Sequence, residues 1–182
     1  TPDGQLPGRV IAAHLGNGGS LCAILDGRSI ATTMGYSTAD GIPMATRSGA
    51  VDPGALLAVM RQDGLDADGL EDLLYNRSGV LGMSGGLSAD MKVLLKSSDP
   101  AAKQAIDFYC YRTSREIGSL ASALGGLDAL VFTGGIGANA GAIRDDITTR
   151  LAWLGVPDKV SVYAFDTDEE SVIAGYTSSF LA

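Results

Sequence analysis

The sequence predicts an α/β fold in which three consecutive strands precede a long helical region and two further strand–helix pairs. Two observations favour this class. Short apolar runs bounded by turn residues alternate with longer segments of helical periodicity. Glycines cluster at the edges of apolar segments, at residues 16–19, 79–86 and 134–137. Because glycine lets the backbone approach a ligand closely, these clusters predict a binding surface.

The composition is that of a one-domain globular protein. The 182 residues are 46% hydrophobic and 19% charged, with a formal charge of −8. That charge repels a phosphate backbone, and Lys and Arg do not cluster, which argues against a nucleic-acid partner. No stretch reaches the roughly 18 apolar residues of a membrane span. We therefore expect a soluble, cytoplasmic protein with no membrane partner. Because the chain begins at Thr1 rather than methionine, we expect it to be a piece of a longer polypeptide.

The first elements predict a three-stranded meander. Apolar runs occupy residues 9–15, 21–25 and 28–34. Asp26 and Gly27, between the last two runs, form a strong hairpin signal because both residue types tolerate positive φ.

The middle of the chain is predicted to be helical. Four N-cap signals open helices there, and two of them are followed by proline at the first helical position. The caps are Asp52, Asp66, Ser88 and Asp99. We expect the helix after Asp52 to reach Gln62 and the longest helix, after Asp99, to end near Leu124 at a glycine pair. Residues 66–124 are interpreted as a helical insert.

Two strand–helix pairs close the chain. Residues 128–133 and 159–165 are expected as strands, and residues 140–151 and 169–182 as helices. Cys22 and Cys110, the two cysteines, are expected as free thiols because a domain of this size needs no disulfide.

The glycine-rich turn at residues 16–20 follows the first strand and leaves two interpretations open. Its amide groups suit a phosphoryl group lying against the turn. It also fits a plain hairpin. His14, the only histidine, stands where the strand meets this turn, and it is either a packed core residue or a donor to a phosphate oxygen.

A second turn, at residues 134–140, follows a strand and opens a helix, which is a natural anion site. Gly135, Gly137 and Ala140 satisfy the G-x-G-x-x-G/A dinucleotide pattern. This pattern requires an acidic residue about 20 positions on, at the end of the next strand, and the nearest such residue, Asp166, comes 31 positions after Gly135. The upstream meander is also foreign to a dinucleotide-binding unit.

Several polar residues allow both a structural and a functional interpretation. Arg47 is either a surface ion-pair former or a group that stabilises charge on a transferring phosphoryl. Asp90 and Lys92 either contact a ribose or base or belong to a helix N-cap. The acidic run at residues 166–170 either favours a helix N-terminus or supplies a carboxylate to Mg²⁺.

Motifs that the sequence lacks exclude several classes of active site. A single histidine excludes His-rich metal sites, and no G-x-x-x-x-G-K-[ST] segment is present for a P-loop. Residues 82–86 match G-x-S-x-G, but no strand precedes them and no histidine follows. A serine hydrolase is therefore not expected.

Six segments together resemble the acetate kinase family in order and spacing. They are residues 14–20, 33–36, 46–53, 78–82, 131–137 and 167–170. The resemblance covers the C-terminal portion of that family's chain, and the family's N-terminal domain has no counterpart here. It implies an actin-like ATPase (ribonuclease H-like) βββαβαβα unit with a helical insert, a single nucleotide-binding domain over residues 1–182, and nucleotide held between two halves.

The resemblance also implies ATP/ADP and Mg²⁺ as cofactors, acetate as substrate and a homodimer. By motif position, Arg47 is the catalytic residue at the acetyl phosphate, and Glu169 bears on Mg²⁺. The nucleotide-binding residues that it implies are His14, Asn17, Gly18, Asp90, Met91, Lys92, Gly135, Ile136, Gly137 and Asn139.

The chain departs from the family pattern in three places. Lys92 stands where the family commonly has arginine, and Ala138 stands at a usual glutamate position. The connection at residues 155–159 is shorter than the family's. The expected activity is reversible phosphoryl transfer from ATP to a short carboxylate. The alternatives are a sugar or glycerol kinase of the same superfamily and a non-catalytic nucleotide-binding domain.

Overall fold

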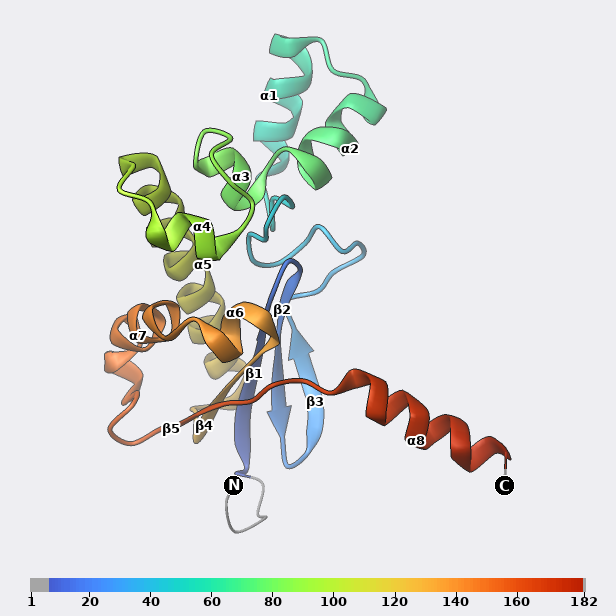
Figure 1. Cartoon of the computed structure of the whole chain (residues 1–182), viewed down its shortest axis with the longest axis vertical. Coiled ribbons are helices and arrows are strands. Elements are labelled where there is room, and N and C mark those ends of the chain that lie inside the picture. Colours follow the sequence, from blue (N-terminus) through green and yellow to red (C-terminus); the bar gives the residue numbers. More distant parts are fainter. Residues whose placement is uncertain (1–6, 182) are drawn as a thin grey trace.

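A computed structural model describes residues 7–181, with the side chains of Glu169, Val172 and Leu181 outside the described part (Figure 1). Its centre is a mixed five-stranded sheet in the order β3-β2-β1-β4-β5. β1 pairs antiparallel with β2 and parallel with β4, β2 pairs antiparallel with β3, and β4 pairs parallel with β5. The strands are β1 Arg9–Leu15, β2 Gly19–Leu25, β3 Arg28–Thr32, β4 Ala129–Thr133 and β5 Ser161–Ala164.

The three-stranded meander is confirmed. Asp26 and Gly27, between β2 and β3, have φ of 48° and 78°, which is the positive-φ pair of a tight hairpin turn. β3 ends at Thr32, two residues before the expected end, because Thr32 and Thr33 turn their hydroxyls back to β2 at Leu21.

The helices follow the cap signals closely. They are α1 Pro53–Asp63, α2 Ala67–Asn76, α3 Gly79–Met83, α4 Met91–Lys96, α5 Pro100–Leu124, α6 Gly134–Asn139, α7 Gly141–Arg150, the 3₁₀ turn η1 Ala152–Leu154, and α8 Glu169–Leu181. Asp52, Asp66 and Asp99 each accept a backbone N–H as expected. The cap of α4 was predicted wrongly: it is Asp90, and Ser88 instead accepts the Asp90 N–H.

The C-terminal elements differ from the prediction in their bounds. One helix was expected over residues 140–151, whereas α6 and α7 divide the region 134–150 and meet at Ala140. β5 is shorter than the expected strand. Residues 155–160 lead into β5 and are anchored at two buried side chains, Val156 and Val160, which are 1% and 2% exposed.

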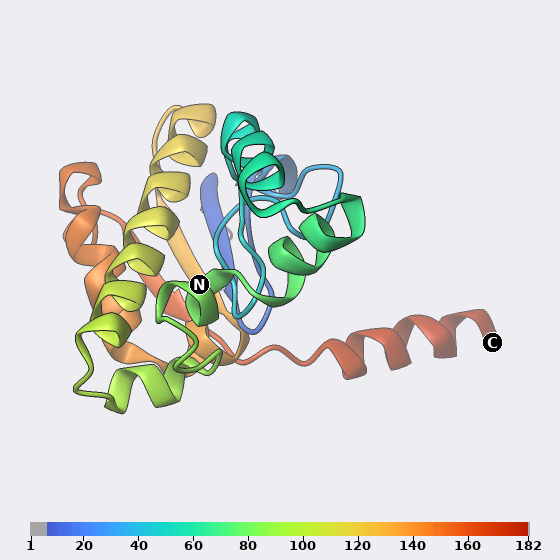
Figure 2. The same ribbon diagram turned by 90° about the horizontal axis from the view of Figure 1, so that it is seen from above.

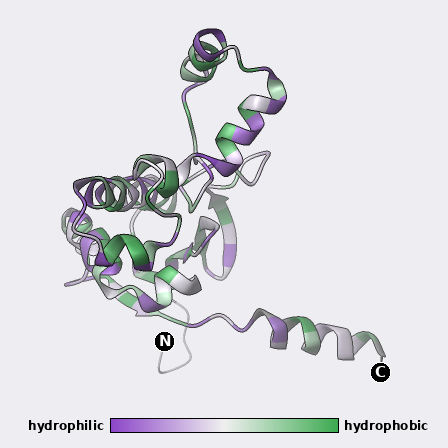
Figure 3. Cartoon of the chain, turned by 45° about the horizontal axis from the view of Figure 1, so that its top comes forward, coloured by the Kyte–Doolittle hydropathy of each residue, from purple (hydrophilic) through white to green (hydrophobic). Residues whose placement is uncertain are grey.

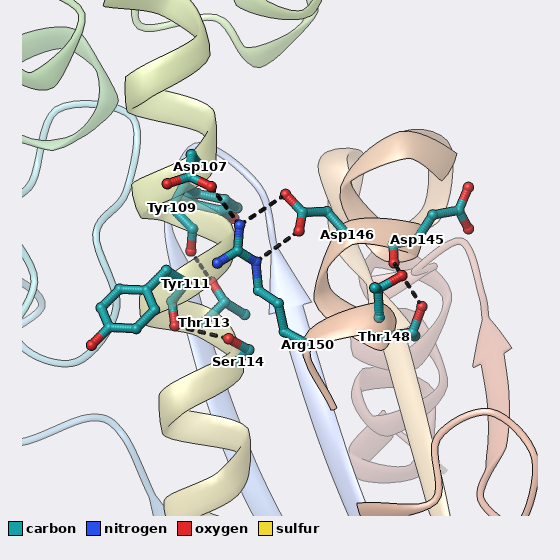
Figure 4. Close-up of polar contacts among 10 residues, drawn as sticks. Asp107, Tyr109, Tyr111, Thr113, Ser114, Asp145, Asp146, Thr148 and Arg150 are labelled. Carbon is teal, nitrogen blue, oxygen red and sulfur yellow. Dashed lines mark hydrogen bonds and ion pairs between the residues drawn. The ribbon is translucent and has the colours of Figure 1, made fainter. Parts of the chain in front are cut away.

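The core lies between one face of the sheet and the helices α5 and α7, which contact each other (Figure 2). The sheet side chains in this core are Ile11, Ala13, Leu15, Leu21, Ala23, Leu130 and Phe132. Arg150 of α7 ties the two helices together. Its guanidinium pairs with Asp146 at 2.7 Å and with Asp107 of α5 at 2.5 Å (Figure 4).

A second ion pair, between Arg9 and Asp128, joins the amino-terminal ends of β1 and β4. The Arg9 guanidinium donates to the Asp128 carboxylate and, at 3.0 Å, to the Gly125 carbonyl at the end of α5. The Arg9 backbone N–H also donates to Asp128 at 2.9 Å. The side-chain hydrogen bond from Arg9 lowers the pKa of Asp128.

Two parts of the chain stand away from the core. The hairpin of α1 and α2 projects from one end of the molecule (Figure 1), and neither helix contains a buried residue. α8 extends sideways from the rest of the molecule after residues 165–168 (Figure 3). Its apolar side chains Ile173, Tyr176 and Phe180 are 64%, 69% and 87% exposed.

Candidate nucleotide-binding site

A cavity of about 880 Å³ opens at the carboxyl ends of β1 and β4. The two strands are parallel neighbours, with His14 and Thr133 as register partners, so the turns that follow them emerge side by side. A Cβ on Gly16 would lie 3.9 Å from the amide nitrogen of Gly135. Parallel strands of an open sheet commonly place a ligand at this edge.

Eight of the sequence-predicted residues line this cavity. They are His14, Asn17, Asp90, Met91, Lys92, Gly135, Ile136 and Asn139. The lining also includes three residues of the acidic run at 166–170 and four residues that were not predicted as contacts. The former are Thr167, Asp168 and Glu170, and the latter are Gly16, Leu95, Gly134 and Ala140. The structure thus brings together residues that are more than 150 positions apart in the chain.

Arg47 and Gly18 lie beside the cavity rather than on its lining. A Cβ on Gly18 would be 3.7 Å from an Arg47 terminal nitrogen, so the cation stands against the glycine turn. The Ala45 N–H donates to the Asn17 carbonyl at 3.1 Å, which fixes the Arg47 loop to that turn. Among the described residues, Arg47 takes part in no ion pair and donates only to the Thr38 carbonyl, at 3.3 Å, and weakly to a methionine sulfur.

Gly137 is buried and does not line the cavity. A Cβ there would meet Phe132 at 3.5 Å, so the position serves the packing of α6 on β4. Gly134 is also a packing position, although it borders the cavity. Its φ is +78°, and a Cβ would lie 2.7 Å from the Leu15 carbonyl oxygen.

His14 is anchored on one side of its ring. Its Nδ1 lies 3.0 Å from the Thr133 hydroxyl oxygen. The opposite edge of the ring faces the cavity turns: a Cβ on Gly134 would be 3.1 Å from Cε1, and a Cβ on Gly16 would be 4.0 Å from Nε2. The ring edge that bears Cε1 and Nε2 therefore lies near both glycine turns.

The short helix α6 is held from α7. One Arg144 nitrogen donates to the carbonyls of Gly137 and Ala138 at 2.8 and 2.7 Å. The Asn139 amide donates to the Gly135 carbonyl at 3.2 Å. These bonds satisfy carbonyls that a helix end otherwise leaves unpaired. Sequence reasoning missed Arg144, whose signal is only a cation shortly after a glycine-rich segment.

Asp90 combines the two roles that the sequence left open. One of its carboxylate oxygens accepts the Lys92 N–H at 2.8 Å as the N-cap of α4, and the residue also lines the cavity. Met91 is 3% exposed and belongs mainly to the core.

The acidic segment before α8 contributes Asp168 and Glu170 to the cavity. Asp168 accepts hydrogen bonds from the Ser171 hydroxyl at 2.6 Å and from its N–H at 3.0 Å. The side-chain hydrogen bond is the main reason that the pKa of Asp168 is lowered, so this carboxylate stays ionised. The side chain of Glu169, the predicted Mg²⁺ contact, lies outside the described residues.

Within residues 7–181 as described, no three His, Cys, Asp or Glu side chains gather as a metal centre. Mg²⁺ bound with a nucleotide needs only one or two carboxylates because phosphates and water complete its shell. Asp168 and Glu170 fit that requirement. No described helix combines the length and apolar composition that crossing a bilayer requires.

The sheet order and the paired glycine turns define an α/β protein of the actin-like ATPase fold. A sequence model of the acetokinase family matches residues 5–181. The chain therefore belongs to the acetokinase family.

Curated acetate kinases are similar to this chain in sequence. The chain is 50% identical over 186 residues to an acetate kinase of Rhodopseudomonas palustris (strain TIE-1), which covers 92% of this chain and 46% of that protein. It is 46% identical over 191 residues to the acetate kinase of Nitrobacter hamburgensis, covering 96% and 47%. The chain thus spans about half the length of the curated relatives it matches.

Solved structures agree in fold. The acetate kinase of Porphyromonas gingivalis superposes with a TM-score of 0.90 at 37% identity, over 96% of this chain and 49% of that one. The acetate kinase of Entamoeba histolytica gives 0.86 at 34% identity, over 94% and 51%. A propionate kinase of Francisella tularensis gives 0.85 at 36% identity, over 91% and 48%.

Proposed function

We propose that this chain is the nucleotide-binding portion of an acetate kinase, which transfers the terminal phosphoryl group of ATP to acetate and makes acetyl phosphate and ADP reversibly. The observation that carries the proposal is the single cavity lined by eight residues at the family's motif positions. The acetokinase family match over residues 5–181 supports the same activity.

The chemistry suits a site with one histidine. The pKa of a short carboxylate is close to the glutamate reference of about 4.3, so acetate is already an ionised nucleophile at neutral pH. No general base is needed, in contrast to a sugar or glycerol kinase, which must deprotonate a hydroxyl. Phosphoryl transfer then depends on positioning and on charge stabilisation.

Arg47 is proposed to supply the charge stabilisation. Its guanidinium has no carboxylate partner among the described residues and stands against the turn at Gly18. A planar cation with several donors matches the oxygens of a migrating phosphoryl group. His14, Asn17 and Gly18 are assigned to the phosphates of the nucleotide.

The remaining predicted residues are assigned to the nucleoside. These are Asp90, Met91, Lys92, Gly135, Ile136, Gly137 and Asn139, of which Gly137 acts through packing rather than contact. The magnesium ion that accompanies ATP would neutralise charge on the phosphates. We assign it to the acidic segment that holds Asp168, Glu169 and Glu170.

The whole reaction is proposed to need more than this domain. We propose residues 1–182 as one nucleotide-binding domain with a helical insert over about residues 66–124, paired in the working enzyme with a second lobe and acting as a cytoplasmic homodimer. Because one side of the cleft is contributed by the second lobe, this chain alone is expected to bind ADP weakly and to show no turnover.

Hydroxamate trapping of acyl phosphate tests the activity. The assay is run with ATP and acetate, and again with glycerol, on this chain alone and on this chain fused after the N-terminal half of the Rhodopseudomonas palustris enzyme. We expect hydroxamate only from the fusion and only with acetate. Strong turnover by the chain alone would contradict the need for a second lobe, and ATP consumption with glycerol would favour the sugar-kinase alternative.

A further inference from the structure

The ring of His14 has one fixed partner. Its Nδ1 lies 3.0 Å from the hydroxyl oxygen of Thr133, the residue opposite it in the parallel pairing of β1 and β4. Both side chains are half-buried. Among the described residues, no carboxylate pairs with His14. The ring is therefore oriented by a neutral hydroxyl.

The hydroxyl of Thr133 does not cap the helix that follows it. It is the N-cap residue of α6, where a threonine hydroxyl normally accepts an N–H of the first turn. No such bond forms here, and the hydroxyl turns to His14 instead. The Thr133 hydroxyl is therefore engaged with the ring of His14 and not with the first turn of α6.

A hydroxyl is a suitable partner because it both donates and accepts. In the neutral ring, the Thr133 hydroxyl either donates to bare Nδ1, which leaves the ring proton on Nε2, or accepts from Nδ1–H, which leaves Nε2 bare. When the ring is protonated, Nδ1–H donates to the same oxygen, and Nε2 carries a proton. In the first neutral arrangement and in the protonated ring, His14 presents an N–H donor at Nε2, on the ring edge that lies near the turn at Gly16.

We propose that Thr133 is a positioning residue that keeps the Nε2–H of His14 directed at the phosphate portion of a bound nucleotide in either protonation state. The inference rests on the proposed function for its ligand. It assigns Thr133 a role through His14, and not a contact with the reacting atoms.

The first test needs no ligand. His14 is the only histidine of the chain, so the ¹⁵N resonances of its ring are assigned without ambiguity. At a pH where the ring is neutral, we expect one tautomer with the proton on Nε2 in the unchanged chain and in Thr133→Ser, and a mixture in Thr133→Val. A proton on Nδ1, or a mixture of tautomers in the unchanged chain, would overturn the proposal.

The second test measures ADP and adenosine binding by calorimetry on the 182-residue chain. Thr133→Val should weaken ADP by about tenfold, the factor for a net hydrogen bond, and leave adenosine unchanged. Thr133→Ser should restore ADP affinity. Thr149→Val, an exposed threonine on α7, is the matched control and should bind like the unchanged chain.

A double-mutant cycle with His14→Ala separates positioning from direct contact. Once His14 is removed, Thr133→Val should weaken ADP no further. An equal loss of ADP affinity in both backgrounds, or an equal loss for adenosine, would overturn the inference while leaving the proposed function intact. Absence of ADP binding by the unchanged chain, with the tautomer result as expected, would instead overturn the proposed function and the ligand assigned here.

Discussion

Arg47 is the residue on which the proposed chemistry depends most. It lies next to Gly18, outside the lining of the nucleotide cavity, and its guanidinium is free of carboxylate partners in the described residues. We therefore expect this cation to affect the transferring phosphoryl group more than the bound nucleotide.

Replacing Arg47 with alanine in the fusion enzyme should therefore lower kcat by about 10³–10⁵, as for loss of an arginine finger. ADP affinity should change little because the residue is not on the cavity lining. Initial rates of hydroxamate formation and ADP calorimetry measure the two quantities. Arg61→Ala, on the exposed surface of α1, is the control. An unaltered kcat would remove Arg47 from the mechanism.

Asp128 carries a pH-dependent part of the stability. Arg9 lowers the pKa of this carboxyl, so its contribution is fully present above the unfolded-state value, near 3.9, and is lost as pH falls through the lower folded-state value. Asp128→Asn should thus reduce the free energy of unfolding at pH 7 and have almost no effect at a pH below the folded-state pKa. Urea titrations at the two pH values measure this difference. Asp145→Asn, an exposed site on α7, should show no such pH dependence.

Single residues also show how far sequence reasoning reaches. Asp52, Asp66 and Asp99 were identified as caps because capping depends on three or four neighbouring residues. The pairing of His14 with Thr133 spans 119 positions and depends on strand register, which no local pattern encodes. The different positions of Gly135, on the cavity, and Gly137, in the core, are also not encoded locally. They follow from the packing of α6 against Phe132.

At the scale of elements, α6 is the most informative difference between sequence and structure. Its 6 residues are too few to show helical periodicity, and its glycines are typical of a turn. α3, with 5 residues, was missed for the same reason. The long helix α5 and the meander were predictable because cap, period and terminator agree over many residues.

Arg144 is expected to control the order of α6. Arg144→Met removes two hydrogen bonds, each contributing about 1 kcal/mol net, and so should speed amide hydrogen exchange over residues 137–141 and weaken ADP binding. The thermal midpoint of the whole domain should fall by a few degrees only. Hydrogen exchange with mass spectrometry measures the local effect. Arg115→Met, which removes a cation stacked over Tyr111 on the exposed side of α5, is the control; the same exchange pattern in both variants would contradict the assignment.

At the scale of the whole molecule, a compact sheet-and-helix core carries two appendages. No other element packs substantially against α8 among the described residues, and its large side chains Ile173, Tyr176 and Phe180 face solvent. The sequence placed this helix correctly, but its lack of a packing partner is a property of three-dimensional arrangement and was not predictable.

Deleting residues 169–182 should leave the thermal midpoint of the core within a few degrees of the unchanged chain because no described element packs substantially against α8. The deletion should also reduce self-association, since it removes exposed apolar surface. Calorimetry and light scattering measure the two effects. A large fall in the midpoint would show that α8 stabilises the sheet in solution.

The pairing of β1 with β4 couples the edge of the cavity to the hydrophobic core. His14 and Thr133 are register partners at the cavity end of this pairing. One residue earlier, Ala13 is paired with Phe132, and both of these side chains are fully buried. The distance between the two glycine turns is therefore set from the interior of the sheet, and we expect a core substitution that shifts this pairing to move both turns.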